Sequence, residues 1–308
     1  MDVNKICGII VPIVTPFTPD ERINQNELRR QVNRQIENGI HGIFCFGTNG
    51  EGYALNYDEK KLVLETVIDE VRGRVPVYAG TGCVTTRETL RESRMAQDVG
   101  ADALSVITPS FAVASQDEIY EHYRTVAAAV DLPVIFYNIP ARTGNAISSA
   151  TVARLTDIDN IVGAKDSSGN FQNLLAYLNV TKKRPDFKVL AGNDQLILWN
   201  LLAGGAGAIA GCANVFPHTI VRIYECFAAG NVEQARFFQD AIQDFRDTFK
   251  YGNPNTIIKA AVALSGYDVG PCRAPFNTIP EEGIAAIRNI MEKNLFQFML
   301  QKIWLDTN

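Results

Sequence analysis

The strongest constraint on the fold is a repeated alternation of short apolar runs with longer segments of helical period. It begins with the run Cys7 to Val14, the helical segment Asn26 to Asn38 and the run Ile43 to Phe46. Runs that are apolar at consecutive positions suit strands buried on both faces, as in parallel sheets covered by helices. The later runs are Val75 to Ala79, Ala103 to Ile107, Val134 to Tyr137, Ile161 to Ala164, Lys188 to Leu190 and Ala206 to Ala210.

Helical segments separate these runs, namely Asp58 to Val71, Thr85 to Val99, Gln116 to Val130, Ser149 to Leu155, Gly169 to Leu178, Asp194 to Leu202 and Pro217 to Ala228. About eight strands and eight helices in alternation predict an α/β fold, a (β/α)8 TIM barrel. A doubly wound open sheet needs fewer units and is the alternative fold.

The last 80 residues lack strand-like runs and show helical periodicity instead. Helices are expected near Val232 to Lys250, Thr256 to Leu264 and Glu281 to Asn294. No linker or low-complexity segment divides the chain. We therefore expect a barrel over residues 1–228 and a C-terminal helical extension, residues 229–308, packed on it.

Charge and hydropathy point to a small-molecule partner. The net charge is −5 and Lys and Arg are scattered, so no surface for nucleic acid or an anionic membrane is expected. No apolar run approaches the roughly 18 residues of a membrane span, and the N-terminus lacks a signal peptide's hydrophobic region. We expect a cytoplasmic protein with a large buried core, since 46% of its residues are hydrophobic.

Cysteine and histidine spacing argues against disulfides and metal sites. The six cysteines are spread singly, without a Cys-x-x-Cys pair, as expected of reduced thiols. His41, His122 and His218 are far apart, and none has a second ligand at metal-binding spacing. We expect structural or surface roles for the histidines and no metal.

Polar residues and glycines break the apolar pattern where four predicted strands end. In a barrel the chemistry lies at the carboxyl ends of the strands, so these residues are candidates for a functional site. The four segments are Gly47 to Gly52, Tyr137 to Gly144, Lys165 to Ser168 and Gly192 to Asp194.

Lys165 directly follows the run Ile161 to Ala164, which predicts a lysine in dry surroundings at the mouth of the barrel. A dry environment favours the neutral amine, a nucleophile that forms imines with ketones. Such an imine can accept the electrons of a breaking carbon–carbon bond. The plainer interpretation is an ion pair with Asp166, and spacing alone favours it.

The loop from Gly47 to Gly52 offers backbone N–H groups and the Thr48 hydroxyl, which suit a carboxylate, although a tight turn is the simpler interpretation. A tyrosine such as Tyr137 can transfer protons, and Arg142 can bind a carboxylate. The segment Gly205 to Ala210 resembles part of a dinucleotide motif but leads into a strand, so NAD is not expected.

Taken together, these motifs resemble the dihydrodipicolinate synthase and N-acetylneuraminate lyase superfamily over essentially the whole chain. The resemblance implies a barrel lyase that forms a Schiff base with pyruvate or another 2-keto acid, uses no cofactor and assembles as a homotetramer. It also reverses the preference for a Lys165–Asp166 ion pair. It is carried by Gly47-Thr48-Asn49-Gly50-Glu51, Tyr137-Asn138-Ile139-Pro140, Lys165, Gly192-Asn193-Asp194, Gly207-Ala208-Ile209, Ala213-Asn214, Asn253-Pro254, Lys259 and Arg273-Ala274-Pro275-Phe276.

The resemblance implies roles for individual residues. Lys165 matches the Schiff-base lysine, and Tyr137 matches the acid/base that moves protons. Thr48 and the Asn49 backbone would hold the keto-acid carboxylate. The other substrate-binding residues implied are Gly47, Phe111, Arg142, Ser167, Gly192, Asp194 and Ile209.

Two departures bear on the substrate. The synthases have a second threonine where this chain has Asn49, and a tyrosine where it has Phe111. In the synthases that tyrosine reaches a neighbouring subunit's site. Phenylalanine has no hydroxyl and cannot pass a proton there. Arg142, however, matches the arginine that the synthases use for the carboxylate of aspartate semialdehyde. Ser167 and Asp194 fall where the sugar-acid lyases contact substrate hydroxyls.

Two reactions are therefore considered. The first is aldol cleavage of a 2-keto-3-deoxy sugar acid to pyruvate and an aldehyde. The second is condensation of pyruvate with aspartate semialdehyde, the 4-hydroxy-tetrahydrodipicolinate (dihydrodipicolinate) synthase reaction. Dehydration or deamination through the same imine is a related outcome. A non-catalytic barrel and an NAD-dependent oxidoreductase are the remaining classes.

Overall fold

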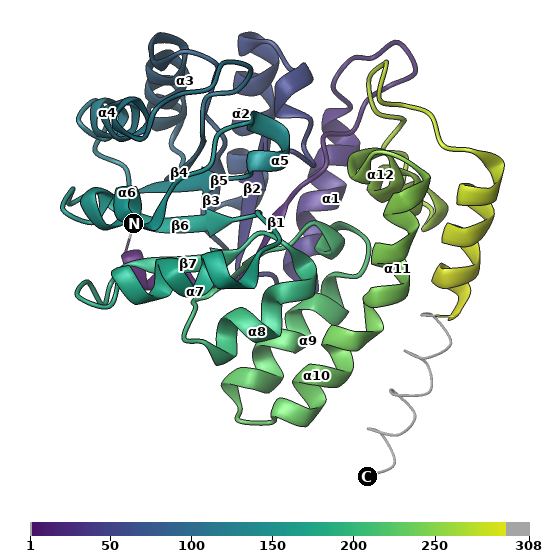
Figure 1. The fold of residues 1–308 in the computed structure, drawn as a ribbon. Coiled ribbons are helices and arrows are strands. Elements are labelled where there is room, and N and C mark those ends of the chain that lie inside the picture. The colour runs from purple at the N-terminus through teal and green to yellow at the C-terminus, as the bar shows by residue number, and fades with distance from the viewer. Residues whose placement is uncertain (1, 294–308) are drawn as a thin grey trace.

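The computed structural model describes residues 2–293 of the 308-residue chain. Within them, eight parallel strands follow one another in chain order around a closed barrel, and the last strand pairs with the first (Figure 1). Because a closed barrel has no open edge, the (β/α)8 prediction is confirmed and the doubly wound alternative is wrong.

The strands are short and almost entirely buried, as their apolar runs predict. Their bounds are β1 Gly8–Pro12, β2 Gly42–Cys45, β3 Val77–Ala79, β4 Ala103–Ile107, β5 Val134–Asn138, β6 Ile161–Asp166, β7 Lys188–Ala191 and β8 Gly207–Ile209. The predicted third run was two residues too long at its start, since β3 begins at Val77.

The α-helices that connect the strands are α1 Gln25–Glu37, α2 Tyr57–Val71, α3 Thr86–Val99, α4 Gln116–Ala127, α5 Pro140–Thr143, α6 Ser149–Leu155, α7 Phe171–Val180, α8 Ile197–Leu202 and α9 Pro217–Ala228. Short 3-10 turns are η1 Val3–Lys5, η2 Gly52–Ala54, η3 Asp194–Leu196 and η4 Gly211–Asn214. Capping boxes begin α2 at Asn56 and α4 at Ser115, where the side chain and a glutamate three residues later exchange hydrogen bonds with the backbone.

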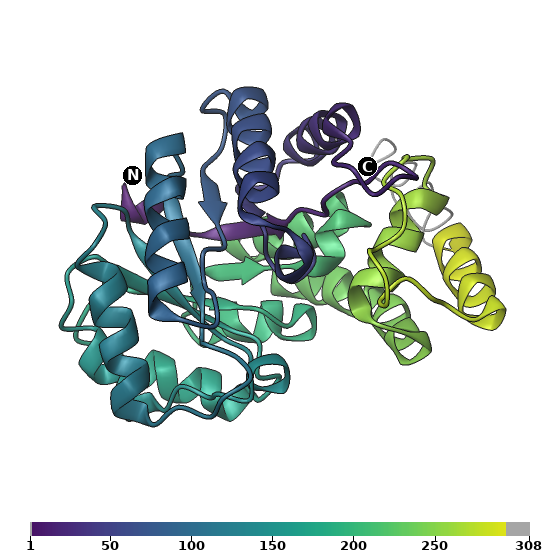
Figure 2. The same ribbon diagram turned by 90° about the horizontal axis from the view of Figure 1, so that it is seen from above.

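Further helices follow the barrel and lie to one side of it when the molecule is seen from above (Figure 2). They are α10 Val232–Ala241, α11 Gln243–Asp247, η5 Thr248–Tyr251 and α12 Pro254–Leu264, and residues 281–293 are also helical. The helical segment predicted for Val232 to Lys250 is therefore broken near Ile242. The predicted end of the last helix, Asn294, lies outside the described residues.

Two clusters of buried apolar side chains hold these elements together. The smaller cluster fills the barrel and includes Ile10, Phe44 and Leu190. The larger one lies between the barrel and its helices and extends from Leu28 to Ile257 of α12. Because one cluster spans both parts of the chain, the C-terminal helices are packed against the barrel and can contribute to its mouth.

Three findings concern membranes, thiols and metals. No helix within residues 2–293 is long and apolar enough to cross a membrane. All six cysteines lie in this range and are free. In the same part of the chain, no three His, Cys, Asp or Glu side chains gather as ligands for a metal ion.

His122 gives the fold a predicted pH dependence. Its ring is buried on α4 and shares a hydrogen bond of 2.9 Å with Thr86, and burial lowers its pKa to about 4. The unfolded chain takes up this proton at a higher pH than the folded chain, near the usual value of about 6.5. The free energy of unfolding therefore contains the full contribution of neutral His122 above a pH of about 6.5. As the pH drops toward 4, this contribution is lost, and the free energy of unfolding falls by an amount on the order of 3 kcal/mol.

Urea unfolding between pH 4 and pH 7 measures this dependence. In His122→Gln, which retains a polar partner for Thr86, the slope of unfolding free energy against pH should be smaller than in the wild type. Equal slopes in the two proteins would contradict the prediction.

Candidate active site

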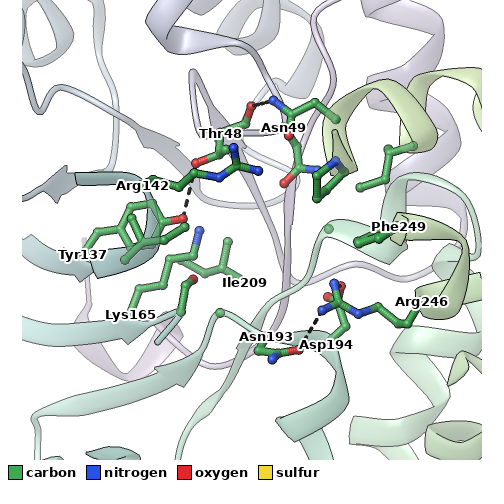
Figure 3. A pocket seen from close by; sticks show the side chains of 17 residues that line it. Thr48, Asn49, Tyr137, Arg142, Lys165, Asn193, Asp194, Ile209, Arg246 and Phe249 are labelled. Carbon is green, nitrogen blue, oxygen red and sulfur yellow. Dashed lines mark hydrogen bonds and ion pairs between the residues drawn. The ribbon is translucent and has the colours of Figure 1, made fainter. Parts of the chain in front are cut away.

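Most of the predicted site residues converge on one pocket at the carboxyl ends of the barrel strands (Figure 3). Residues at the ends of β5, β6 and β8, or just after β2, β5, β6, β7 and β8, line much of the pocket. Four strand ends far apart in sequence were expected to meet here, and the closed barrel brings them together. From the predicted set it includes Thr48, Asn49, Tyr137, Arg142, Lys165, Ser167, Gly192, Asp194 and Ile209.

Lys165 lies in the wall of this pocket with its side chain almost fully buried. Its Nζ atom is 3.8 Å from the centroid of the Tyr137 ring and 5.1 Å from that of Phe44. Asp166 follows it in β6, but successive strand residues face opposite sides, and its carboxylate accepts hydrogen bonds from Asn138 and Ser168. Lys165 has no carboxylate partner within residues 2–293, so the plainer interpretation of a Lys165–Asp166 ion pair is wrong.

Tyr137 lies directly beside Lys165, because β5 and β6 pair with these two residues in register. The oxygens of the Tyr137 and Thr48 hydroxyls are 3.3 Å apart. Burial opposes ionisation of the phenol, but the positive charge of Lys165 and hydrogen bonds from Thr48 and Ser167 outweigh it, and the pKa of Tyr137 is lowered. A hydroxyl of this kind can donate and accept a proton.

The lowered pKa of Tyr137 is open to direct measurement. The difference in tyrosinate absorbance between the wild type and Tyr137→Phe should titrate with a midpoint below about 10, the value for a free tyrosine. Lys165→Met should move the midpoint upward, because it removes the neighbouring positive charge while the site remains buried. A wild-type midpoint at or above the free value would contradict this interpretation of the site.

The loop after β2 is held in one conformation. Its backbone approaches neighbouring groups so closely that a Cβ atom on Gly52 would lie 2.0 Å from the carbonyl oxygen of Phe46. Asn255 of α12 donates a hydrogen bond to the Thr48 carbonyl. Within the described chain, the backbone N–H groups of Thr48 and Asn49 donate to no protein acceptor. The loop thus presents free donors suited to an anion.

The opposite wall of the pocket contains Ser167, Gly192 and Asp194. A Cβ atom on Gly192 would lie 2.0 Å from Ser167 Oγ and 3.0 Å from Lys165 Cε. Glycine is therefore required here to leave room for the lysine. Asp194 is buried, and its Oδ2 atom is 3.4 Å from the backbone nitrogen of Cys212.

Two predicted residues lie outside this pocket, and Arg142 lines it at the rim. Arg142 is exposed at the rim, where its Nη2 atom donates a 3.4 Å hydrogen bond to Asn253. Gly47 lines an adjoining pocket that also contains Thr48, Tyr137 and Arg142. Phe111 lines neither pocket, and its side chain is 98% exposed. A role for Phe111 within its own subunit's pocket therefore has no support in the geometry.

Sequence reasoning missed Arg246, Phe249 and Asn255, which also line the pocket. Asn255 follows the Asn253-Pro254 pair that contributes to the family resemblance, so that motif was a usable signal. Arg246 belongs to a helical segment rich in charged residues, and no local pattern distinguishes it. Only the packing of α11 against the barrel reveals that it faces the site.

Comparison with known proteins identifies the family of the chain. The model of the dihydrodipicolinate synthetase family matches residues 5–294. A protein called an uncharacterized DapA-like lyase from Halobacterium salinarum is 39% identical over 280 residues, 91% of each chain. A 4-hydroxy-tetrahydrodipicolinate synthase from Methanopyrus kandleri is 39% identical over 292 residues, 94% of this chain and 96% of the relative.

Solved structures give the same result. YagE, a prophage protein of Escherichia coli K12 from the dihydrodipicolinic acid synthase family, was solved in complex with pyruvate. It superposes with a TM-score of 0.90 at 32% identity, covering 94% of this chain and 98% of that one. Dihydrodipicolinate synthase from Thermotoga maritima has a TM-score of 0.90 at 30% identity, with 93% and 98% coverage. The chain therefore belongs to the dihydrodipicolinate synthetase family and is a lyase of the class I aldolase type.

Proposed function

We propose that Lys165 forms an imine with a 2-keto acid and that the enzyme reversibly cleaves 2-keto-3-deoxy sugar acids to pyruvate and an aldehyde. The observation that supports this most strongly is the buried Lys165 amine, which lies against Tyr137 and has no carboxylate partner in residues 2–293. Because no carboxylate holds the proton on this lysine, Tyr137 beside it can accept that proton and leave the amine free to attack a ketone.

In the proposed reaction, Lys165 attacks the keto carbon and water leaves to give an iminium ion. Tyr137 accepts the proton of the C4 hydroxyl, the C3–C4 bond breaks, and its electrons pass into the iminium group to give an enamine. The aldehyde leaves, C3 is protonated, and water hydrolyses the resulting imine to pyruvate and the free lysine. The protein supplies the electron sink itself, so the proposed cycle uses no cofactor.

We assign the keto-acid carboxylate to the loop after β2. Thr48 and Asn49 line the pocket together with Lys165, and their backbone N–H groups donate to no acceptor among the described residues. A carboxylate held there would leave the rest of the substrate to extend toward Ser167, Asp194 and Arg142. A substrate that carries several hydroxyl groups beyond its keto group suits the polar side chains on that wall.

Condensation of pyruvate with aspartate semialdehyde is the second candidate. Arg142 at the rim and the names of several relatives favour it. Phe111 argues against it, because this side chain cannot pass a proton into a neighbouring site. Rescue of growth in a mutant that lacks the lysine-pathway synthase would establish this activity.

We also propose that the enzyme is a homotetramer in the cytoplasm. Phe111 and Val113 are 98% and 84% exposed, which is unusual for apolar side chains and suits a subunit interface. The six free cysteines fit a reducing compartment. Light scattering on the purified protein would give its mass.

The test of the proposed function is pyruvate release, coupled to lactate dehydrogenase, from a panel of 2-keto-3-deoxy sugar acids and N-acetylneuraminate. Cleavage that disappears in Lys165→Ala would support the proposal and identify the substrate class. If no member of the panel is cleaved, the sugar-acid proposal falls, and pyruvate with aspartate semialdehyde is the next pair.

A further inference from the structure

Arg246 reaches the pocket from α11, outside the barrel strands (Figure 3). Its Nη2 atom donates a 3.1 Å hydrogen bond to Asn193 Oδ1, and its Nη1 atom is 3.4 Å from Asp194 Oδ2. The guanidinium lies 4.6 Å from the centroid of the Phe249 ring. Two of these contacts orient the side chain toward residues that follow β7, and the third packs it against the Phe249 ring.

The ion pair between Arg246 and Asp194 leaves hydrogen-bonding atoms unused. Asp194 is 3% exposed, yet its Oδ1 atom has no hydrogen-bond partner among the described residues, and neither has Arg246 Nε. A buried charged atom without a partner is costly, so such an atom indicates a missing group. Both residues line the pocket, and the two unpartnered atoms lie buried just behind its surface, so a small rotation of either side chain would turn an acceptor or a donor toward a ligand.

The chemistry of this pair selects a particular kind of ligand. The opposite charges of Arg246 and Asp194 largely cancel, so the pair does not favour a second carboxylate in the way that a lone arginine does. A hydroxyl group donates one hydrogen bond and accepts others, which matches the unused acceptor and donor together. Two adjacent hydroxyls match them equally well.

The position of the pair is also defined relative to Lys165. Figure 3 shows Asp194 and Arg246 on one side of the pocket and Thr48 and Arg142 on another, with Lys165 between these groups. If the keto-acid carboxylate lies on the Thr48 loop, the part of the substrate beyond C4 is free to reach Arg246.

We propose that Arg246 is a specificity-determining residue that, with Asp194, binds hydroxyl groups of the aldehyde half of a polyhydroxylated 2-keto-3-deoxy acid. This inference rests on the proposed aldol cleavage and adds the feature by which the enzyme distinguishes a sugar acid from a simple aldol. Arg246 does not touch the reacting bond, so its removal affects the choice of substrate and leaves imine formation intact.

The test compares two substrates in the wild type and in Arg246→Met. One is a 2-keto-3-deoxy sugar acid, and the other is 4-hydroxy-2-ketopentanoate, which has no hydroxyl beyond C4. Loss of a hydrogen bond to a charged group should lower kcat/KM for the sugar acid by about 10- to 100-fold. The kcat/KM for 4-hydroxy-2-ketopentanoate should fall by a factor that is smaller by about tenfold or more, because this substrate has no hydroxyl beyond C4 to lose its partner.

Arg236→Met is the matched control, since Arg236 lies on α10 with 69% of its side chain exposed and does not line the pocket. It should leave both kcat/KM values unchanged. Arg246→Lys keeps a positive charge beside Asp194 but lacks the Nε donor, so it should also lose discrimination. This variant decides the question if Arg246→Met does not fold.

The outcomes separate this inference from the proposed function. Borohydride trapping of pyruvate in the wild type reports the imine alone, and its absence would overturn the proposed function. Trapping that persists while Arg246→Met and Arg246→Lys slow both substrates equally would overturn the role of Arg246, as would a wild type that cleaves only 4-hydroxy-2-ketopentanoate. A selective loss on the sugar acid supports it.

Discussion

Lys165→Met should lower kcat for every 2-keto acid substrate by at least about 10⁴-fold, the scale on which removal of a covalent nucleophile acts. Without the amine no iminium ion forms, and the electrons of the C3–C4 bond have no acceptor. Methionine has a similar length and is apolar, and the lysine stem is already buried next to Phe44 and Tyr137. We therefore expect the variant to fold and to fail in chemistry alone.

Lys188→Met is the control for this change. Lys188 begins β7, at the opposite end of the barrel strands from the pocket, and does not line the site. Its replacement should leave kcat unchanged, and circular dichroism should show both variants folded. Activity of Lys165→Met above about one hundredth of the wild-type value would contradict a covalent role for this lysine.

Lys259→Met should destabilise the protein by about 3–5 kcal/mol, the usual cost of breaking a buried ion pair by removing one partner. Lys259 is 1% exposed, and its Nζ atom is 2.7 Å from Glu51 Oε1. The other carboxylate oxygen of Glu51 accepts a 2.9 Å hydrogen bond from the backbone of Arg273. The variant would leave the charge of Glu51, itself 0% exposed, without its cation.

Denaturant unfolding measures this loss. Adding Glu51→Gln to Lys259→Met removes the uncompensated charge and should restore part of the stability. Lys61→Met provides the control, because Lys61 is 49% exposed and its ion pair is with the equally exposed Glu65, so a change within about 0.5 kcal/mol is expected. A Lys259→Met variant as stable as this control would show that the buried pair contributes little.

The ion pair between Glu51 and Lys259 connects the two parts of the chain. Glu51 belongs to the loop after β2, and Lys259 belongs to α12, beyond the proposed boundary at residue 228. Asn255 of the same helix donates a hydrogen bond to the Thr48 carbonyl oxygen. The proposed division into residues 1–228 and 229–308 separates strand-bearing from helical sequence, and the second part completes the site of the first.

Much of the site followed from the sequence because periodicity and strand ends are local signals. Alternating apolar runs predicted the barrel, and the barrel placed Tyr137 and Lys165 at the same edge. The pairing with Asp166 was the local alternative, and it was wrong because successive residues of a strand face opposite sides. The family resemblance argued against this ion pair, because it rests on motifs at several strand ends together and not on the neighbours of Lys165 alone.

Other features depended on tertiary packing. Arg246 and Arg236 are both arginines in one helical segment of the sequence, yet one lines the pocket and the other faces solvent. The helix is interrupted near Ile242, so Arg236 belongs to α10 and Arg246 belongs to α11. No local sequence pattern predicts that break, so Arg246 could be recognised as a pocket residue only from the structure.

The central claim is that Lys165 is the residue that binds the keto acid covalently. The direct measurement is to incubate the enzyme with pyruvate, reduce the mixture with borohydride, digest the protein and locate the adduct by mass spectrometry. We predict one reduced pyruvate adduct, on the peptide that contains Lys165, and none in Lys165→Met. No adduct at saturating pyruvate, or an adduct on another lysine, would contradict the claim.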